Sequence, residues 1–323
     1  MPRKDPEKSL LPVEAWAIQY RNRNTRSTYT SSVYNFLAAV YDLEREKRVT
    51  PENSGKWEAL AVRYLDEDRD HAADLMLFVG SMAGRPPMTV KRYVSAVREW
   101  FIHYDRELTG KQERQLRQRL PKGGAVTIEK DMDHAMIRTI LSHLDLKNRA
   151  LYLLLASSGM RIGEALQLKL DDVKLPDAGV EDIGTVTVRA EYTKTKQQRI
   201  TFCSKEAAAA LTEWKKKREK YLKGAEYRGK GLGIYKNLND PRLFPFSDTT
   251  TGYAWEDALK AAGLYSRDPV TNRLQIHPHM LRKFFSSQLS IAVPKDIVEM
   301  LMGHKGYLSD AYRRYSRKQI EEF

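Results

Sequence analysis

Residues 111–124, KQERQLRQRLPKGG, interrupt the apolar periodicity of the chain and divide it into two parts of different character. The segment is basic and polar and ends in proline and two glycines, a composition typical of linkers. With 323 residues, the chain is long enough for two domains of ordinary size. We therefore expect a first domain over residues 1–118, a basic linker over 119–127 and a second domain over 128–323.

The first part carries apolar residues at helical spacing. Tyr29, Val33 and Val40 form one stripe, after Ser27 or Thr28 as the expected N-cap. Two further apolar segments of the same kind cover residues 72–83 and 88–104. Because this part shows no strand pattern, we expect a small all-helical bundle.

The second part combines further helices with two short β-rich runs. Thr185–Val188 and Arg199–Phe202 flank a polar tip, which predicts a hairpin. Helices are expected over residues 204–222, 250–263, 278–291 and 295–302. The fold class predicted for the chain is therefore mainly α with a small antiparallel β-sheet.

The balance of 55 Lys and Arg against 42 Asp and Glu gives a formal net charge of +13. Such an excess favours a polyanionic partner, since phosphate polymers are bound through Lys and Arg; an ordinary basic surface is the alternative. The single cysteine, Cys203, excludes an internal disulfide framework and a multi-cysteine zinc site. No apolar run reaches the length of a membrane span, and the N-terminus lacks a secretory pattern. We expect a cytoplasmic protein.

Several cationic residues stand where the predicted structure turns. Arg161 opens a helix after SSGM, Lys194 lies at the hairpin tip, and His304 follows a glycine in LMGHKG. His279 and Arg282 are three residues apart, which places them on one helical face. Taken singly, each has an ordinary explanation: a surface ion pair of Arg161 with Glu164, a solvated lysine, or a satisfied histidine.

Together these residues suit phosphodiester transfer without a metal ion. Planar guanidinium groups bind the non-bridging oxygens of a phosphate bidentately. A lysine can protonate a 5′-hydroxyl leaving group as general acid. A tyrosine hydroxyl, with an ordinary pKa of about 10, needs a base or cationic surroundings to act as nucleophile.

In chain order, the segments SGMRIGE, TKTKQQR, HMLR, MGH and a final tyrosine resemble the Arg, Lys, His-x-x-Arg, His and Tyr motifs of the tyrosine recombinase (integrase) family. The resemblance implies a helical core-binding domain followed by a mixed α/β catalytic domain. It also implies a 3′-phosphotyrosyl intermediate that needs neither a metal ion nor another cofactor. The catalytic set that it implies is Arg161, Lys194, His279, Arg282 and His304, with Tyr312 as nucleophile and Tyr315 as its alternative.

Within that resemblance, Arg161 and Arg282 would hold the scissile phosphate and Lys194 would protonate the 5′-oxygen. Glu164 would support the turn that carries Arg161. The tail, with DAYRRYS, resembles archaeal-type integrases and favours Tyr312. Expected partners are double-stranded DNA with a specific recombination site and further copies of the chain, a synaptic tetramer on DNA and a monomer or dimer free of it. A virus or plasmid is a possible source.

Basic residues outside this set are expected to contact DNA, although charged helix faces are often only solvated. They are Arg26, Lys91, Arg92, Arg98, Lys196, Arg199 and Lys283. Two alternatives remain open at this point. One is a DNA-relaxing (type IB topoisomerase-like) or telomere-resolving enzyme with the same site, and the other is a catalytically inert architectural DNA-binding protein.

Overall fold

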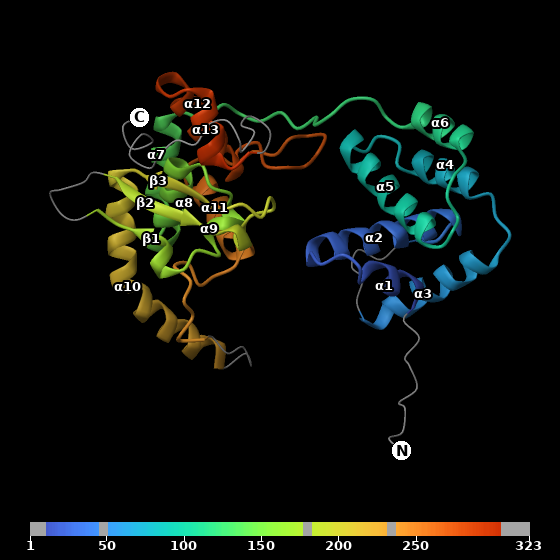
Figure 1. Cartoon of the computed structure of the whole chain (residues 1–323), viewed down its shortest axis with the longest axis horizontal. Coiled ribbons are helices and arrows are strands. Elements are labelled where there is room, and N and C mark those ends of the chain that lie inside the picture. The colour runs from blue at the N-terminus through green and yellow to red at the C-terminus, as the bar shows by residue number, and fades with distance from the viewer. Residues whose placement is uncertain (1–10, 45–50, 177–182, 231–236, 305–323) are drawn as a thin grey trace, which may run out of the picture. The chain divides into compact units, whose positions relative to one another are not determined.

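A computed structural model describes residues 11–44, 51–176, 183–230 and 237–304 of the protein (Figure 1). Tyr312 and Tyr315 lie outside the described residues. The chain divides into two compact units, with the division after Thr127. The first unit also includes residues 269–272, and the second unit contains the remainder of the chain from Ile128.

The first unit consists of helices, as the apolar spacing predicts. α2 packs against α1, α3, α4 and α5, and α4 also packs against α6. Its core is rich in fully buried aromatic side chains, among them Trp16, Phe36 and Trp100. The helices are α1 (Pro12–Ala17), α2 (Arg23–Val40), α3 (Pro51–Asp66), α4 (His71–Ser81), α5 (Pro87–His103) and α6 (Gly110–Arg119).

The expected start of α2 at Ser27 or Thr28 is wrong. The side chain of Asn22 caps the helix, because its oxygen accepts hydrogen bonds from the backbone N–H groups of Asn24 (2.9 Å) and Thr25 (3.3 Å). An Asn at this position satisfies N–H groups that have no partner inside the helix. The polar residues that follow Asn22 are therefore the first turn of the helix.

The basic segment from residue 111 begins as a helix of the first unit and not as a linker. Thr109 and Gln112 form a capping box at the start of α6. Leu116 is buried among the first-unit core residues, which anchors an otherwise polar helix. The helix ends at Arg119, and Pro121, Gly123 and Gly124 follow it.

The second unit contains the predicted hairpin within a three-stranded antiparallel sheet of order β1-β2-β3. Gly184 pairs with Cys203 and Val188 with Arg199 across β2 and β3. β1 was not predicted, because its two residues are too few to show the alternation of apolar and polar residues that marks a strand. The strands are β1 (Val173–Lys174), β2 (Gly184–Val188) and β3 (Arg199–Cys203).

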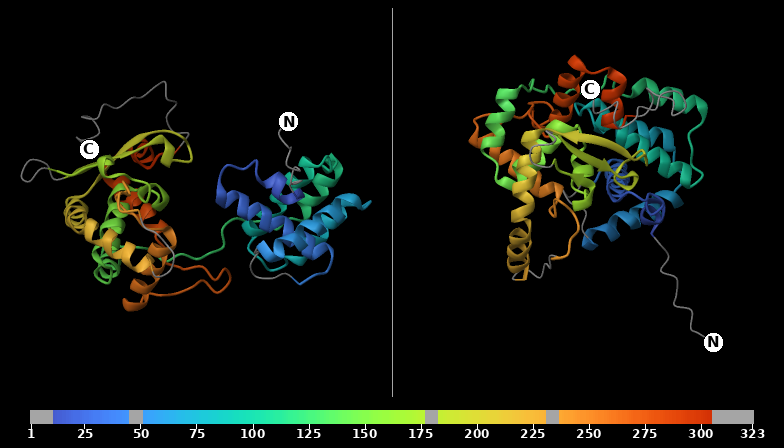
Figure 2. Two further views of the ribbon diagram at one scale, coloured as in Figure 1. Left: turned by 90° about the horizontal axis from the view of Figure 1, so that it is seen from below. Right: turned by 60° about the vertical axis from the view of Figure 1, so that its left-hand side comes forward.

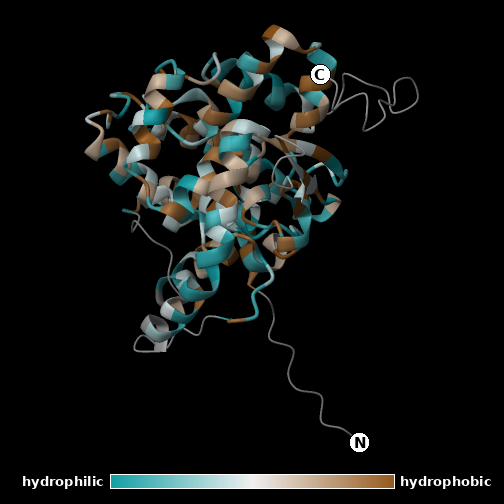
Figure 3. Ribbon diagram, turned by 90° about the vertical axis from the view of Figure 1, so that its left-hand side faces the viewer, coloured by the Kyte–Doolittle hydropathy of each residue, from teal (hydrophilic) through white to brown (hydrophobic). Residues whose placement is uncertain are grey.

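Helices complete the second unit, and α8 lies at its centre. α8 packs against α7, α10, α12 and β3, while β3 also contacts α13. Figure 2 shows the strands and helices of this unit from two further sides. Hydrophobic and hydrophilic residues are interleaved along these helices (Figure 3), as one-sided burial requires. The helices are α7 (His134–Ser142), α8 (Leu146–Ser158), α9 (Ile162–Ala165), η1 (Leu170–Asp172), η2 (Ala190–Tyr192), α10 (Lys205–Lys230), α11 (Asp248–Ala261), α12 (His279–Ala292) and α13 (Lys295–Met302).

The predicted fold class, mainly helical with a small antiparallel sheet, is confirmed. Among the described residues, no helix combines the length and the apolar character needed to cross a membrane.

Candidate active site

A tight turn after α8 delivers Arg161 to the site. Gly159 ends α8 in the left-handed conformation, with φ +64°, which glycine adopts without strain. Arg161 is then the N-cap residue of α9, and its guanidinium is partly exposed. Because a β-carbon at position 159 would lie 2.3 Å from the ring of Phe285, the turn can pack against α12 only with glycine there.

Glu164 is the buried anchor of this turn. Its carboxylate accepts hydrogen bonds from the backbone N–H of Arg161 (3.0 Å) and from the guanidinium groups of Arg161 (3.1 Å) and Arg199 (2.6 Å). Its exposed fraction is 2%. Burial acts to raise the pKa of Glu164, but the hydrogen bond and charge of Arg199, followed by Arg161, outweigh it and lower the pKa. The role expected for Glu164 from the resemblance, support of the Arg161 turn, is consistent with these contacts.

The lowered pKa of Glu164 predicts a loss of stability in acid. A carboxyl group whose pKa is lower in the folded state than its ordinary value of 4.5 stabilises the fold fully above that pH. This contribution decreases as the pH falls through the folded-state pKa. We therefore expect the free energy of unfolding to fall below about pH 4.5, and to fall less steeply in Glu164→Gln; denaturant titrations at several pH values measure both. Equal slopes in the two proteins would contradict the assignment.

Arg199, which is expected to contact DNA, has its described partners inside the protein. Arg199 begins β3, but its side chain turns inward and only 8% of it is exposed. Besides the ion pair with Glu164, its Nε donates a hydrogen bond to the carbonyl of Leu301 (2.8 Å) at the end of α13. These internal partners make Arg199 a bridge between α9, β3 and α13.

Arg282 is buried, with 3% of the residue exposed. Its guanidinium donates to the carbonyl of Gly159, to the carbonyl of Met302 (2.7 Å) and to Nε2 of His304 (2.9 Å). Burial, followed by the positive charge of Arg161, lowers the pKa of Arg282 to about 10, so it remains cationic at neutral pH. Arg282 thereby joins α12 to the ends of both α8 and α13.

His304 is held from two sides. Its Nδ1 contacts the carboxylate of Glu299, and its Nε2 contacts Arg282. Gly303, with φ +70°, ends α13 and lets the backbone N–H of His304 return to the carbonyl of Glu299 (3.0 Å). The contact between Glu299 and His304 cannot be predicted from helical spacing, because Glu299 lies in α13 and His304 follows the end of that helix.

His279 is the first residue of α12 and lies at the surface. Its partial burial lowers its pKa from 6.5, and the charges of Arg282, His277, Lys283 and Arg161 lower it further. A negatively charged ligand would offset these charges. His277 stacks beside it, with 6.3 Å between ring centroids, and contacts Glu129 (3.2 Å).

The structure thus brings four predicted residues into one cluster: Arg161, His279, Arg282 and His304. They come from the α8–α9 turn, the start of α12 and the end of α13. Lys194 stays apart in the described contacts, exposed in the turn after η2. The buried carboxylate of Asp172 anchors the residues just before that turn, because it accepts hydrogen bonds from Arg189 (2.6 Å) and Tyr192 (2.9 Å).

The remaining basic residues expected at DNA differ in their surroundings. Arg98 forms an ion pair with Glu113 (2.7 Å), and Lys283 pairs with Glu129. The side chains of Lys91 and Arg26 donate to the carbonyls of Gly123 (2.8 Å) and Tyr20 (3.1 Å). Arg92 lies over the ring of Tyr93, and Lys196 is exposed in the hairpin turn.

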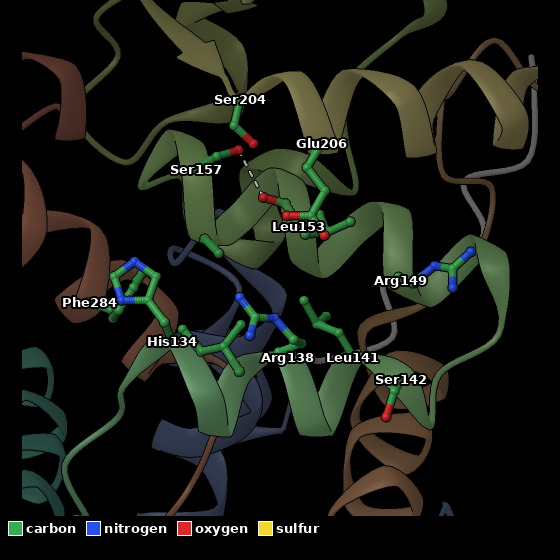
Figure 4. Close-up of a pocket in the computed structure, with 12 residues that line it drawn as sticks. His134, Arg138, Leu141, Ser142, Arg149, Leu153, Ser157, Ser204, Glu206 and Phe284 are labelled. Carbon is green, nitrogen blue, oxygen red and sulfur yellow. Dashed lines mark hydrogen bonds between the residues drawn. The ribbon is translucent and has the colours of Figure 1, made fainter.

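A cavity of about 420 Å³ in the second unit is separate from this cluster. It lies between α7, α8, the start of α10 and α12, and none of the predicted site residues lines it (Figure 4). Across the described part of the chain, no three His, Cys, Asp or Glu side chains are grouped in a way that could hold a metal ion.

Comparison with known proteins bears on the family of the chain. The family model described as "Phage integrase family" matches residues 126–322. "Tyrosine recombinase XerC" of Pseudomonas fluorescens is 27% identical over 90% of this chain and 87% of the relative. The protein of the same name from Alcanivorax borkumensis is 26% identical over 78% of this chain and 74% of the relative.

Among solved structures, the XerH site-specific recombinase bound to palindromic difH substrate has the same fold. Its TM-score is 0.55 at 19% identity, over 92% of this chain and 78% of that one. The order Arg161, His279, Arg282, His304 lies inside the residues that the family model matches, and the structure gathers these four side chains at one place. The chain belongs to the phage integrase family.

Proposed function

We propose that this tyrosine-type site-specific DNA recombinase cuts and rejoins DNA through a 3′-phosphotyrosyl intermediate, with Tyr312 as nucleophile. The observation that supports this most directly is the cluster of Arg161, His279, Arg282 and His304, in which Arg161 is paired with the buried carboxylate of Glu164. Such a concentration of positive charge and N–H donors suits a phosphate that gains negative charge as it reacts.

In this proposal the two arginines hold the scissile phosphate from different elements. Arg161 has a partly exposed guanidinium in the turn between α8 and α9. The guanidinium of Arg282 is held by the carbonyls of Gly159 and Met302, so its position does not depend on the DNA. Donors fixed in advance typically contribute a few kcal/mol each, about 10²–10³ in rate.

The chemical step exchanges one phosphoester bond for another. The tyrosine oxygen attacks phosphorus and loses its proton, with His279 assisting the proton transfer. The bond from phosphorus to the 5′-oxygen breaks, and Lys194 supplies the proton that this oxygen gains. The phosphotyrosyl bond conserves the energy of the original ester, so rejoining needs no ATP, metal ion or other cofactor.

The partner in this proposal is duplex DNA with a specific recombination site, bound in the cytoplasm. The first unit, through residues 1–118, and the catalytic domain over 128–323 would bind the duplex together, with residues 119–127 as the basic linker. Tetramer formation on DNA is supported by a lambda integrase tetramer, 18% identical and with a TM-score of 0.51, which was solved on a Holliday junction. Free of DNA, the protein would be a monomer or dimer.

A nicked suicide substrate carrying the recombination site tests the nucleophile. Cleavage releases a short strand next to the nick, which prevents rejoining and traps the covalent protein–DNA adduct. We expect the adduct with wild type and Tyr315→Phe and its loss in Tyr312→Phe, because phenylalanine lacks the attacking oxygen. Denaturing gel electrophoresis measures the adduct.

An EDTA control, the other outcomes and a second product assay interpret this experiment. Adduct formation in EDTA should equal that without it, and a strict metal requirement would contradict the mechanism. If Tyr312→Phe still forms the adduct and Tyr315→Phe does not, the nucleophile is Tyr315. Absence of any adduct with wild type would contradict the catalytic proposal. Holliday-junction products between two duplexes distinguish recombination from DNA relaxation or telomere resolution, which the named recombinase relatives do not favour.

A further inference from the structure

The imidazole of His304 has one proton whose position follows from its neighbours. Arg282 can only donate hydrogen bonds, so Nε2 of His304 must accept at 2.9 Å. The neutral ring then carries its proton on Nδ1, where it donates to the carboxylate of Glu299. The side chains form a continuous line from carboxylate through imidazole to guanidinium.

In this arrangement His304 has no proton on Nε2 to offer a phosphate oxygen. The same bond occupies an N–H of Arg282, whose NH2 group also donates to the carbonyl of Met302. Nε2 of His304 and this N–H of Arg282 are therefore paired with each other. Protonation of Nε2 turns this atom of His304 from an acceptor into a donor. The positive charge of the imidazolium also repels Arg282, so the N–H of Arg282 that was bonded to Nε2 is released.

We propose that Glu299 is a positioning residue that holds the His304 ring and stabilises its protonated form, so that Nε2 of His304 and the released N–H of Arg282 both face the scissile phosphate. This inference rests on the proposed function of the cluster. The proton comes from solvent and binds Nε2, and no bond of the DNA changes in this step.

The backbone favours this role for Glu299. Its side chain is 15% exposed, and the turn at Gly303 brings His304 back over the end of α13. Arg199 limits movement of this turn, because it donates to the carbonyl of Leu301 and lies against Gly303, where an added β-carbon would be 2.9 Å from its guanidinium. The imidazole therefore has a fixed place between its two partners.

Among the described residues, the charges around His304 come from four elements. Glu299 of α13 contacts it directly, as does Arg282 of α12. Arg199 of β3 lies against the preceding glycine, and Glu164 of α9 is paired with it. Because the arginines disfavour a further positive charge and Glu164 is already paired, Glu299 is the carboxylate in direct contact that favours the imidazolium.

The test compares wild type with Glu299→Gln. Glutamine can still accept the Nδ1 proton, so ring position is kept while the negative charge is lost. We expect adduct formation on the suicide substrate to fall as pH rises in both proteins, with the midpoint lower in Glu299→Gln by about one pH unit or more, the effect of one adjacent opposite charge. At pH values below both midpoints, the two rates should converge. Glu219→Gln, which removes an exposed partner of Lys223 on α10, should keep the wild-type profile.

A titration without DNA separates this inference from the function itself. Nitrogen NMR of ¹⁵N-histidine protein, with His304→Gln for assignment, reads the protonated nitrogen of the ring. We expect the Nδ1–H form at high pH and a titration midpoint lower in Glu299→Gln by the same amount. An Nε2–H form, an unchanged midpoint, or a rate lowered equally at every pH would overturn the role of Glu299. If no adduct forms with wild type, the function fails, while this titration still decides whether Glu299 controls His304.

Discussion

Replacing Arg199 with methionine is expected to lower the free energy of unfolding by about 3–5 kcal/mol, the usual cost of leaving a buried charge without its partner. Glu164 would keep only Arg161 as an ionic partner, and Arg161 is itself partly exposed. The carbonyl of Leu301 would lose its Nε donor as well. Chemical denaturation monitored by a second-unit signal, such as Trp214 or Trp255 fluorescence, measures the effect.

Two variants decide whether the effect comes from the buried pair. Glu164→Gln combined with Arg199→Met removes the unpaired charge, so the double variant should recover part of the lost stability. Lys196→Met, three residues earlier in the exposed turn, should stay within about 0.5 kcal/mol of wild type. A stable Arg199→Met protein with weakened DNA binding would instead support the DNA contact expected for Arg199.

Replacing Gly159 with alanine is expected to reduce both stability and adduct formation. An L-residue at φ +64° costs roughly 1–2 kcal/mol, and overpacking against Phe285 typically adds about 1–3 kcal/mol. The carbonyl of Gly159 accepts a hydrogen bond from Arg282, so any shift of the turn also moves a phosphate-binding group. A displacement of about 1 Å can cost 10²-fold in rate.

The matched control is Gly163→Ala, because an added β-carbon there meets no atom within 4 Å and its backbone is helical. This variant should keep wild-type stability and rate. Gly159→Ala combined with Phe285→Leu should regain part of the activity, since the smaller side chain leaves room for the β-carbon while the backbone strain remains. Wild-type adduct formation in Gly159→Ala would contradict the role of this turn.

Much of the fold follows from local patterns. Apolar spacing predicts the helices of both units, and two β-rich runs around a polar tip predict the β2–β3 hairpin. Apolar spacing fails to predict where a helix begins when a polar capping residue sets its first turn. Asn22 starts α2 earlier than expected, and a capping box with one buried leucine makes α6 from a segment of linker composition.

The motifs that carry Arg161, Lys194, His279, Arg282 and His304 resemble those of the family in type and order, and this resemblance alone indicates the family. The tertiary structure alone decided what surrounds each of them. Arg199 and Lys196 look equivalent in TKTKQQR, yet the pleat of β3 turns Arg199 toward Glu164 and Leu301, and Lys196 remains in solvent. The contact between Glu299 and His304 is evident only in the tertiary structure. Burial and contacts between distant segments set charge, tautomer and donor direction, and no local pattern encodes them.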